Sequence, residues 1–154
     1  EIYMYDVEYA KGGEAIFASP KLQKLTMREC DVDIDYTKIG DLNKLKELTI
    51  YYSKFNDDDF RDNTSMLHHF THLEVLTIRG GKIDNLDFLK VMPNMRILDV
   101  TNNNLSDDKV GALLGCTQLE ELHYGDNAMT KAPAFNRSVR MSDAAESNIR
   151  YRSW

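Results

Sequence analysis

Three aspartates at alternate positions, Asp31, Asp33 and Asp35, match the opening ligands of a calcium-binding loop. Such a loop also needs a glycine at its sixth position, for a sharp turn, and a bidentate glutamate at its twelfth. The sequence has Tyr36 and Leu42 at those positions. The spacing therefore does not predict a calcium site.

Three histidines could place two imidazoles four residues apart on one helix face. They are His68, His69 and His72. Zinc would need further glutamate or cysteine ligands, and none stands at a suitable spacing. A solvated helix face is the better interpretation, and we predict no metal site.

The two cysteines, Cys30 and Cys116, are too few to form a disulfide framework. In the repeating pattern described below, Cys30 occupies the asparagine or cysteine position and Cys116 an apolar position before a repeat, so we expect both to be buried in the core. The sequence has no phosphate-binding loop, serine nucleophile elbow or glycine-rich dinucleotide motif, and the glycine pairs 12–13 and 80–81 are predicted turns. We therefore predict neither enzymatic activity nor a cofactor.

The composition narrows the class of partner. The 154 residues are 42% hydrophobic and 29% charged, which is ordinary for one soluble domain, and the formal net charge is −6. An acidic chain does not favour nucleic acid as the partner, and the absence of a long apolar run predicts no membrane insertion. The low cysteine content slightly favours the cytoplasm, whereas three N-x-S/T triplets at 63, 104 and 136 keep an extracellular location open. No pattern indicates the oligomeric state.

A repeat organises the chain. The pattern L-x-x-L-x-L-x-x-N/C-x-L occurs five times, with serine or glycine in the asparagine position of two copies. The copies begin at Leu22, Leu45, Leu73, Met95 and Leu119. A sixth, degenerate copy is predicted at Ile2, Tyr5, Val7 and Ala10. Successive copies are then 20 to 28 residues apart, within or next to the range typical of this pattern.

Positions that played no part in finding the pattern support it. The residues six and three positions before each later copy are all apolar. They are Ile39 and Leu42, Leu67 and Phe70, Leu89 and Met92, and Leu113 and Cys116. Two copies depart from the asparagine position, with Ser53 and Gly81, which leaves the regularity of the middle turns open.

Residues 2–136 resemble the leucine-rich-repeat proteins. The resemblance implies an α/β solenoid with a curved parallel sheet on its concave face and mixed helical and extended returns on its convex face. We divide the chain into a leucine-rich-repeat domain of five to six repeats at 1–136 and a C-terminal cap or basic tail at 137–154.

The return segments differ in length. The stretch 106–114 begins with a capping serine and has Asp107 and Asp108 in its first turn, which predicts a helix. A second helix is predicted within the longest return, 55–72. The segments 31–42 and 84–93 are short, so we predict extended or single-turn structure there.

Strand alternation identifies the residues that face outward on the concave side, because successive side chains point to opposite faces of a sheet. One predicted column is Asp6, Thr26, Thr49, Thr77, Asp99 and His123, and the next is Glu8, Arg28, Tyr51, Arg79, Thr101 and Gly125. The predicted partner-binding residues are Arg28, Thr49, Tyr51, Tyr52, Thr77, Arg79, Ile97, Asp99 and His123. Tyrosine and arginine are enriched at interface hot spots, although tyrosine and threonine are also ordinary strand formers.

After Phe135 the pattern stops. The tail carries four arginines, at 137, 140, 150 and 152, against Asp143 and Glu146. A capping helix beginning near Asp143 is predicted, and a flexible, partner-binding tail is the alternative.

These features predict a non-catalytic protein–protein interaction module that binds a protein partner through its concave face. Two alternatives remain. One is a ligand-recognising ectodomain that uses the same face, and the other is a structural segment of a longer solenoid.

Overall fold

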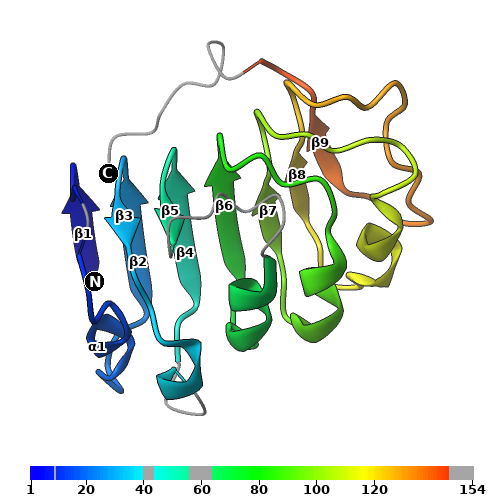
Figure 1. Cartoon of the computed structure of the whole chain (residues 1–154). Coiled ribbons are helices and arrows are strands. Elements are labelled where there is room, and N and C mark those ends of the chain that lie inside the picture. Colours follow the sequence, from blue (N-terminus) through cyan, green and yellow to red (C-terminus); the bar gives the residue numbers. More distant parts are fainter. Residues whose placement is uncertain (9, 40–43, 56–63, 146–154) are drawn as a thin grey trace.

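Parallel strands in chain order dominate the computed structural model, which describes residues 1–8, 10–39, 44–55 and 64–145. Seven of them form one open sheet in the order β1-β2-β4-β6-β7-β8-β9. Their bounds are Ile2–Tyr5, Lys24–Arg28, Glu47–Tyr51, Val75–Arg79, Ile97–Asp99, Glu121–His123 and Arg140–Ser142. Figure 1 shows these strands side by side from one end of the molecule to the other. A second, two-stranded sheet pairs β3 (Asp31–Val32) with β5 (Lys54–Phe55).

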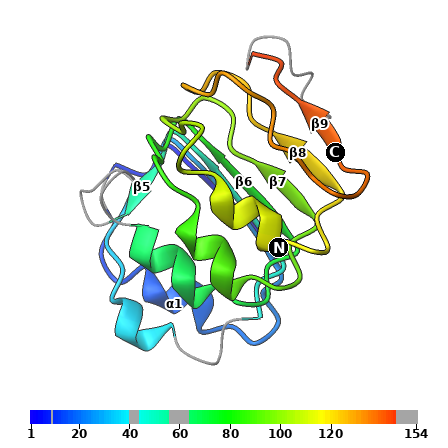
Figure 2. The same cartoon turned by 90° about the vertical axis from the view of Figure 1, so that its right-hand side faces the viewer.

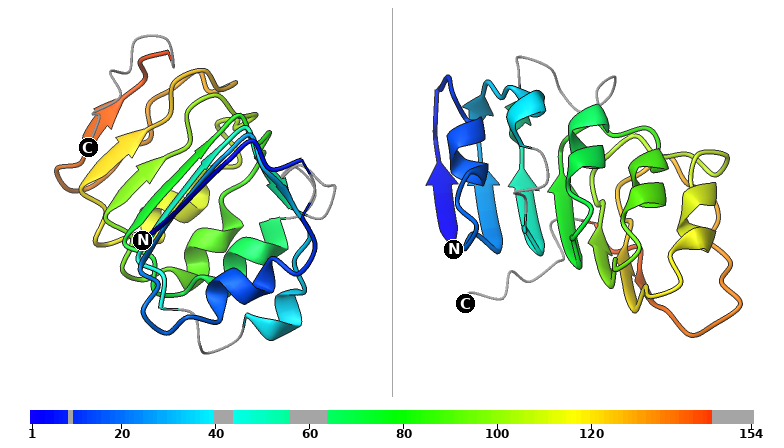
Figure 3. Two further views of the ribbon diagram at one scale, coloured as in Figure 1. Left: turned by 90° about the vertical axis from the view of Figure 1, so that its left-hand side faces the viewer. Right: turned by 90° about the horizontal axis from the view of Figure 1, so that it is seen from below.

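Short helices lie on one face of the large sheet and leave the other face to the strands, as Figures 2 and 3 show from the two ends. They are α1 (Glu14–Phe17) and the 3₁₀ helices η1 (Tyr36–Lys38), η3 (Thr64–His69), η4 (Asp87–Val91) and η5 (Gly111–Gly115). The chain therefore folds as a leucine-rich-repeat solenoid, which confirms the predicted fold. Among the described residues, no helix is both long and apolar enough to cross a membrane.

The strand register confirms the predicted repeat. The second leucine of each copy pairs with its counterpart in the neighbouring strand. This row of Leu25, Leu48, Leu76, Leu98 and Leu122 is buried throughout. Because every strand presents the same kind of residue to the core, burial requires this one register, and a slip by one residue would expose the row.

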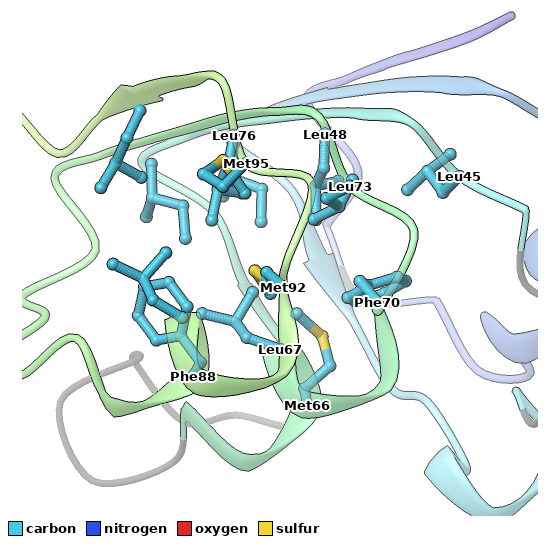
Figure 4. Packing of buried hydrophobic residues seen from close by; sticks show 14 of the residues in the cluster. Leu45, Leu48, Met66, Leu67, Phe70, Leu73, Leu76, Phe88, Met92 and Met95 are labelled. Carbon is cyan, nitrogen blue, oxygen red and sulfur yellow. The ribbon is translucent and has the colours of Figure 1, made fainter. Parts of the chain in front are cut away.

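The returns complete the core from the other side. Figure 4 shows Leu67, Phe70 and Met92 beneath Leu48 and Leu76. Seven of the eight apolar positions that precede the repeats are buried: Ile39, Leu67, Phe70, Leu89, Met92, Leu113 and Cys116. The eighth, Leu42, lies outside the described residues. Cys30 is also buried and both thiols are free, as expected for core cysteines.

The helix predicted at 106–114 is wrong in type and extent. The chain there forms a turn and then the 3₁₀ helix η5 from Gly111. The carboxylate of Asp107 instead accepts hydrogen bonds from the N–H and hydroxyl of Thr130 in the next loop. A 3₁₀ helix rises about 2.0 Å per residue against about 1.5 Å for an α-helix, so it spans a short return with fewer residues.

The second predicted helix, within 55–72, is corrected in the same way. Its described part is the 3₁₀ helix η3, and residues 56–63 lie outside the described part of the chain. The apolar residues expected on its inner face, Met66, Leu67 and Phe70, are fully buried. The prediction of extended or single-turn structure was correct for 84–93, which contains η4, and for 31–39, which contains β3 and η1. Residues 40–42 lie outside the described part of the chain.

Side chains in the asparagine position close the turns after the strands. The amide nitrogen of Asn103 donates to the carbonyl oxygens of Ile78 and Val100, and its oxygen accepts from the N–H of Ile83 in the previous repeat. Ser53 acts similarly, because its hydroxyl accepts from the N–H of Cys30 and donates to the carbonyl of Tyr51. Serine at position 53 therefore keeps a hydrogen bond between repeats where asparagine is absent.

A column of left-handed residues follows the strands. Asp6, Glu29, Tyr52, Asn102 and Asp126 have φ between 47° and 58°, and Gly80 has φ 67° at the equivalent place. Each marks the point where the chain leaves the large sheet. Glycine, asparagine and aspartate adopt this conformation readily, whereas a bulky tyrosine does not.

Candidate interaction surface

The outward-facing residues of the large sheet form the candidate site. The strand register arranges them in columns that cross the sheet. One column is Tyr3, Thr26, Thr49, Thr77, Asp99 and His123, and the next begins with Tyr5, Arg28, Tyr51 and Arg79. The predicted residues Thr49, Tyr51, Thr77, Arg79, Asp99 and His123 are thus brought together on one face.

The register of the first repeat differs from the prediction by three residues. Ile2 pairs with Leu25, so Tyr3 and Tyr5 face outward where Asp6 and Glu8 were expected. In the observed register, the residue equivalent to Leu22 would precede Glu1. The sequence pattern therefore matched the first repeat only when it was shifted by three residues. The alternation of Ile2 and Met4 with two tyrosines was the signal that could have identified the true register.

Tyr3 and Tyr5 are the most exposed aromatic residues of this face. Their side chains are 52% and 57% exposed, and their rings lie nearly parallel with centroids 6.4 Å apart. The hydroxyl of Tyr3 donates to the carboxylate of Glu1 at 2.5 Å, which raises the pKa of the phenol above 10.0. The pair gives a large, ordered apolar surface with hydrogen-bonding ends.

Tyr52 follows the last residue of β4, two strands away from this pair, and is 49% exposed. Its ring crosses Gly80, where an added Cβ would stand 2.3 Å from Cδ1 of the ring. The side-chain amide of Asn102 donates to the Tyr52 hydroxyl at 3.1 Å. The ring is therefore held in place across three repeats, and glycine is required at position 80 both by φ and by space.

Arg28 lies between the tyrosines and is exposed. Its Nε lies 3.2 Å from the carboxylate of Glu29. At the opposite end of the same strand, Lys24 pairs with Glu47 at 2.9 Å. Such surface pairs add little stability, so both cations remain available to a partner at small cost.

Arg79 and Asp99 form a buried ion pair instead of an exposed patch. Their side chains are 5% and 7% exposed, and one carboxylate oxygen of Asp99 accepts from both Nε and Nη2 of the guanidinium. The other carboxylate oxygen accepts from the backbone N–H of Thr101 at 3.1 Å. The Tyr51 ring lies 5.5 Å from the guanidinium carbon and covers the pair. Both residues are thus positioned to support the surface more than to touch a partner.

The last part of the face is also held by internal contacts. Nε2 of His123 lies 2.7 Å from the carboxylate of Glu121, and the other oxygen of Glu121 accepts from Arg140 of β9 at 2.6 Å. Ile97 is half-buried at the start of β7. β9 lies beyond the last matched copy of the repeat and extends the sheet by one strand. The capping helix was predicted to begin near Asp143, but the described residues 143–145 are not helical. The rest of that predicted helix falls on residues 146–154, outside the described part of the chain.

Two grooves flank the sheet. One, of about 340 Å³, opens where the first strands end, and Val7, Glu8, Glu29, Asp31, Tyr52 and Lys82 are among its lining residues. The other, of about 490 Å³, lies between the returns that contain η4 and η5. Within the described ranges, no group of three or more His, Cys, Asp and Glu side chains could hold a metal ion.

The cysteines offer no reactive thiol on this surface. Burial raises the pKa of the Cys116 thiol, which disfavours the nucleophilic thiolate. The thiol of Cys30 donates to the carbonyl oxygen of Arg28 at 3.2 Å and is buried beneath the sheet. What the face presents to solvent is therefore contact area, with hydroxyl groups and charges.

Solved structures of similar shape are leucine-rich-repeat proteins of a bacterium. An internalin (inlF) of Listeria monocytogenes superposes with a TM-score of 0.61 at 19% identity, over 77% of this chain and 33% of its own. Internalin C2 of the same organism gives 0.63 at 20% identity, over 84% of this chain and 55% of its own. The chain thus spans about a third and about half of these neighbours, and the likeness establishes the fold. No protein-family model and no curated protein matches the sequence.

Proposed function

We propose that the protein is a non-catalytic interaction module that binds a protein partner through the first three strands of its concave face. The site centres on Tyr3, Tyr5, Arg28, Tyr51 and Tyr52. The observation that carries this proposal is the exposure of Tyr3 and Tyr5 side by side on β1, since aromatic residues and arginine are enriched at the hot spots of protein interfaces.

The supporting residues have a separate role in this proposal. Arg79 and Asp99 hold the Tyr51 ring from below, and Asn102 holds the Tyr52 hydroxyl. Thr26, Thr49 and Thr77 are half-buried and form a shallow floor between the larger side chains. Prearranged aromatic side chains lose little conformational entropy on binding, which favours affinity.

The test is affinity capture from the lysate and culture supernatant of the source organism, with three forms of the full chain. They are the wild type, a Tyr3→Ser/Tyr5→Ser variant, and Leu114→Ser as a control. Leu114 is 60% exposed in η5 on the opposite side, so its substitution also removes exposed apolar surface. We expect a partner that the wild type and the control retain and the tyrosine variant loses. Equal capture by all three forms would exclude this part of the face.

A further inference from the structure

Both ends of the large sheet are open edges. Within the described residues, β1 pairs with β2 alone and β9 with β8 alone, so each has one side without a neighbouring strand. Figure 1 shows these two strands at opposite ends of the molecule. All the pairs of this sheet are parallel, so the two edges run in the same direction and offer opposite sides. An open edge is a template for pairing with another chain.

On β9, the backbone of Met141 faces the open side. In a parallel pair, alternate residues of a strand direct their N–H and C=O groups toward the same neighbour. The N–H of Arg140 and the carbonyl oxygen of Ser142 both bond to the repeat that contains β8. Met141, between them, therefore directs its backbone groups outward. Its side chain belongs to the row of core leucines, because it pairs with Leu122, yet it is 45% exposed.

On β1, the backbones of Tyr3 and Tyr5 face the open side. The N–H of Asp6 bonds to a carbonyl oxygen of β2, and the same alternation directs the backbone groups of Ile2 and Met4 to β2. The two tyrosines therefore direct theirs outward. An outward-facing residue of each of β4, β6, β7, β8 and β9 donates its N–H to the preceding repeat in this way. The β1 edge thus has the backbone pattern that fits a preceding strand, and β9 has the pattern that fits a following one.

One register continues the rows of the sheet from one copy of the chain into a second. Met141 and Ile2 are the two ends of the row of core residues. Placing them side by side joins the rows of the two copies and covers the exposed Met141 side chain. The same register brings Arg140 beside Glu1. It pairs all three residues of β9, as many as β7 pairs with β8 and β8 with β9.

The row that ends in Glu1 and Arg140 already forms ion pairs between strands. Lys24 pairs with Glu47 at 2.9 Å, and Arg140 pairs with Glu121 at 2.6 Å. The Arg140 side chain is still 76% exposed in its pair. Acidic and basic residues therefore alternate along this row at both edges of the sheet, and Glu1 of a second copy beside Arg140 continues the alternation.

An arginine between two carboxylates is an arrangement that this sheet uses elsewhere. Arg96 lies between Glu120, at 2.9 Å, and Glu74, at 3.9 Å, on the two neighbouring repeats. The pair with Glu121 therefore does not prevent Arg140 from receiving a second carboxylate.

The remaining charges near the two edges are opposite in sign overall. Residues 1–11 carry three carboxylates, on Glu1, Asp6 and Glu8, against the ammonium group of Lys11. Residues 137–145 carry two guanidinium groups, on Arg137 and Arg140, against the carboxylate of Asp143. Asp143 follows the three residues of β9, where the backbone of Ala144 lies against Gly125 beyond β8. The chain at this point turns back over the sheet, away from the open side of β9.

We propose that the β9 edge of one copy pairs in parallel with the β1 edge of a second copy, so that copies join head to tail. What selects a second copy as the occupant is that the backbone pattern, the core row and the ion-pair row all match in a single register. Such a contact is heterologous, so each copy keeps one open edge and further copies can add. The outward side chains stay on the concave face, and the inference therefore goes beyond the proposed function.

The test is sedimentation velocity of the full chain. Loading concentrations should run from about 10 µM to about 1 mM, because a contact through one edge strand is small and should be weak. We expect the weight-average sedimentation coefficient of the wild type to rise with concentration. Tyr3→Pro removes an N–H from the open side of β1, and Met141→Pro removes one from the open side of β9. Proline is tolerated where the N–H of an edge strand faces solvent, so each variant should fold, as circular dichroism checks, and stay monomeric.

An equimolar mixture of these two variants separates head-to-tail pairing from other contacts. The intact β9 of Tyr3→Pro can pair with the intact β1 of Met141→Pro, so the mixture should form a dimer and nothing larger. Arg140→Gln leaves the backbone unchanged and should weaken association by roughly threefold, as expected for one exposed ion pair. Lys131→Gln has the same change in charge outside β9 and should associate like the wild type.

A wild type whose sedimentation coefficient is constant over this range overturns the proposal, and so does a mixture that stays monomeric. Self-association of Met141→Pro alone would indicate pairing between two β1 edges and would also exclude it. None of these results touches the proposed function, which stands if the monomer captures a partner that Tyr3→Ser/Tyr5→Ser loses.

Discussion

The two halves of the concave face use the same kinds of residue in opposite ways. On β1 and β2, Tyr3, Tyr5 and Arg28 extend into solvent, whereas the Tyr51 ring of β4 is half-buried against Arg79. In the second half, Arg79 of β6 bonds to Asp99 of β7, and His123 of β8 contacts Glu121 of its own strand. An outward-facing position in a column therefore does not by itself expose a side chain to a partner. The residues on the adjacent strands decide whether that side chain is exposed or engaged in internal contacts. The proposed binding site therefore lies on the first half, where the aromatic side chains are exposed, and the second half is held by internal contacts.

The largest effect should follow from breaking the ion pair in the second half. Asp99→Ala leaves Arg79 as an uncompensated buried charge, and we expect the free energy of unfolding to fall by about 3–5 kcal/mol. Urea denaturation monitored by circular dichroism measures this loss. Arg96→Ala, which breaks the exposed pair with Glu120, is the control and should leave the midpoint nearly unchanged.

A double variant tests whether the loss of stability comes from the unpaired buried charge. Replacing both partners, as Arg79→Met/Asp99→Leu, removes the buried charges together and should restore most of the lost stability. If Asp99→Ala alone is as stable as the wild type, the pair does not stiffen this half of the face.

Gly80→Ala should have the next largest effect, because it forces a side chain into both a left-handed backbone and the Tyr52 ring. We expect a loss of about 1–3 kcal/mol in the free energy of unfolding. Gly12→Ala is a matched control, since Gly12 has φ 76° but no heavy atom within 4 Å of an added Cβ. The two variants should be compared by thermal unfolding. Equal losses would mean that backbone strain alone matters and that the Tyr52 ring yields freely.

Tyr3→Ser/Tyr5→Ser should leave folding almost intact and weaken partner binding at least about tenfold. The reason is that both rings are more than half exposed, so their removal costs the core little. Isothermal titration with the captured partner measures the affinity, and a thermal melt measures the stability. A variant that loses stability and affinity in proportion would contradict the division between the two halves.

The smallest effect concerns the exposed charges along the strand starts. Hydrogen bonds from Lys46 lower the pKa of Glu74 below 4.5, and those from Arg96 lower the pKa of Glu120. A depressed carboxyl pKa contributes stability above the unfolded value of 4.5 and loses it as pH falls through the folded pKa. We expect the unfolding midpoint to decrease gently below pH 4.5, and 1 M salt to reduce the decrease. A midpoint that rises as the pH falls would contradict this.

The sequence predicted the burial of a residue correctly where equivalent positions occur in several repeats. The leucine rows, the buried cysteines and the apolar return positions were assigned correctly because each had four or five equivalents along the chain. The first repeat was assigned to the wrong register because it matches the pattern poorly, and the alternation of Ile2 and Met4 with Tyr3 and Tyr5, which agrees with the pairing of Ile2 with Leu25, was not used. Tyr3 and Tyr5 therefore entered the candidate site only with the structure.

Helix type could not be predicted for a related reason. Ser106 and the two aspartates after it have the residue types of a helix N-terminus, yet the Ser106 hydroxyl donates to Asp108 and Asp107 binds the next loop. Local preference was outweighed by the span that the return must cover between strands. The partner-binding role assigned to Thr49, Thr77, Ile97 and His123 is still a prediction, since their placement on one face does not test it.

What the sequence determined by itself is the parallel stack, because a repeated apolar pattern can be buried in only one register when every strand carries it. What the tertiary structure decided is which outward residues stay exposed. No feature of the sequence indicates that Arg79 is a buried cation or that the Tyr52 ring is exposed. That distinction arises only when the strands align and bring Asp99 beside Arg79 and Gly80 beneath Tyr52, contacts that join residues 20 and 28 positions apart in the chain.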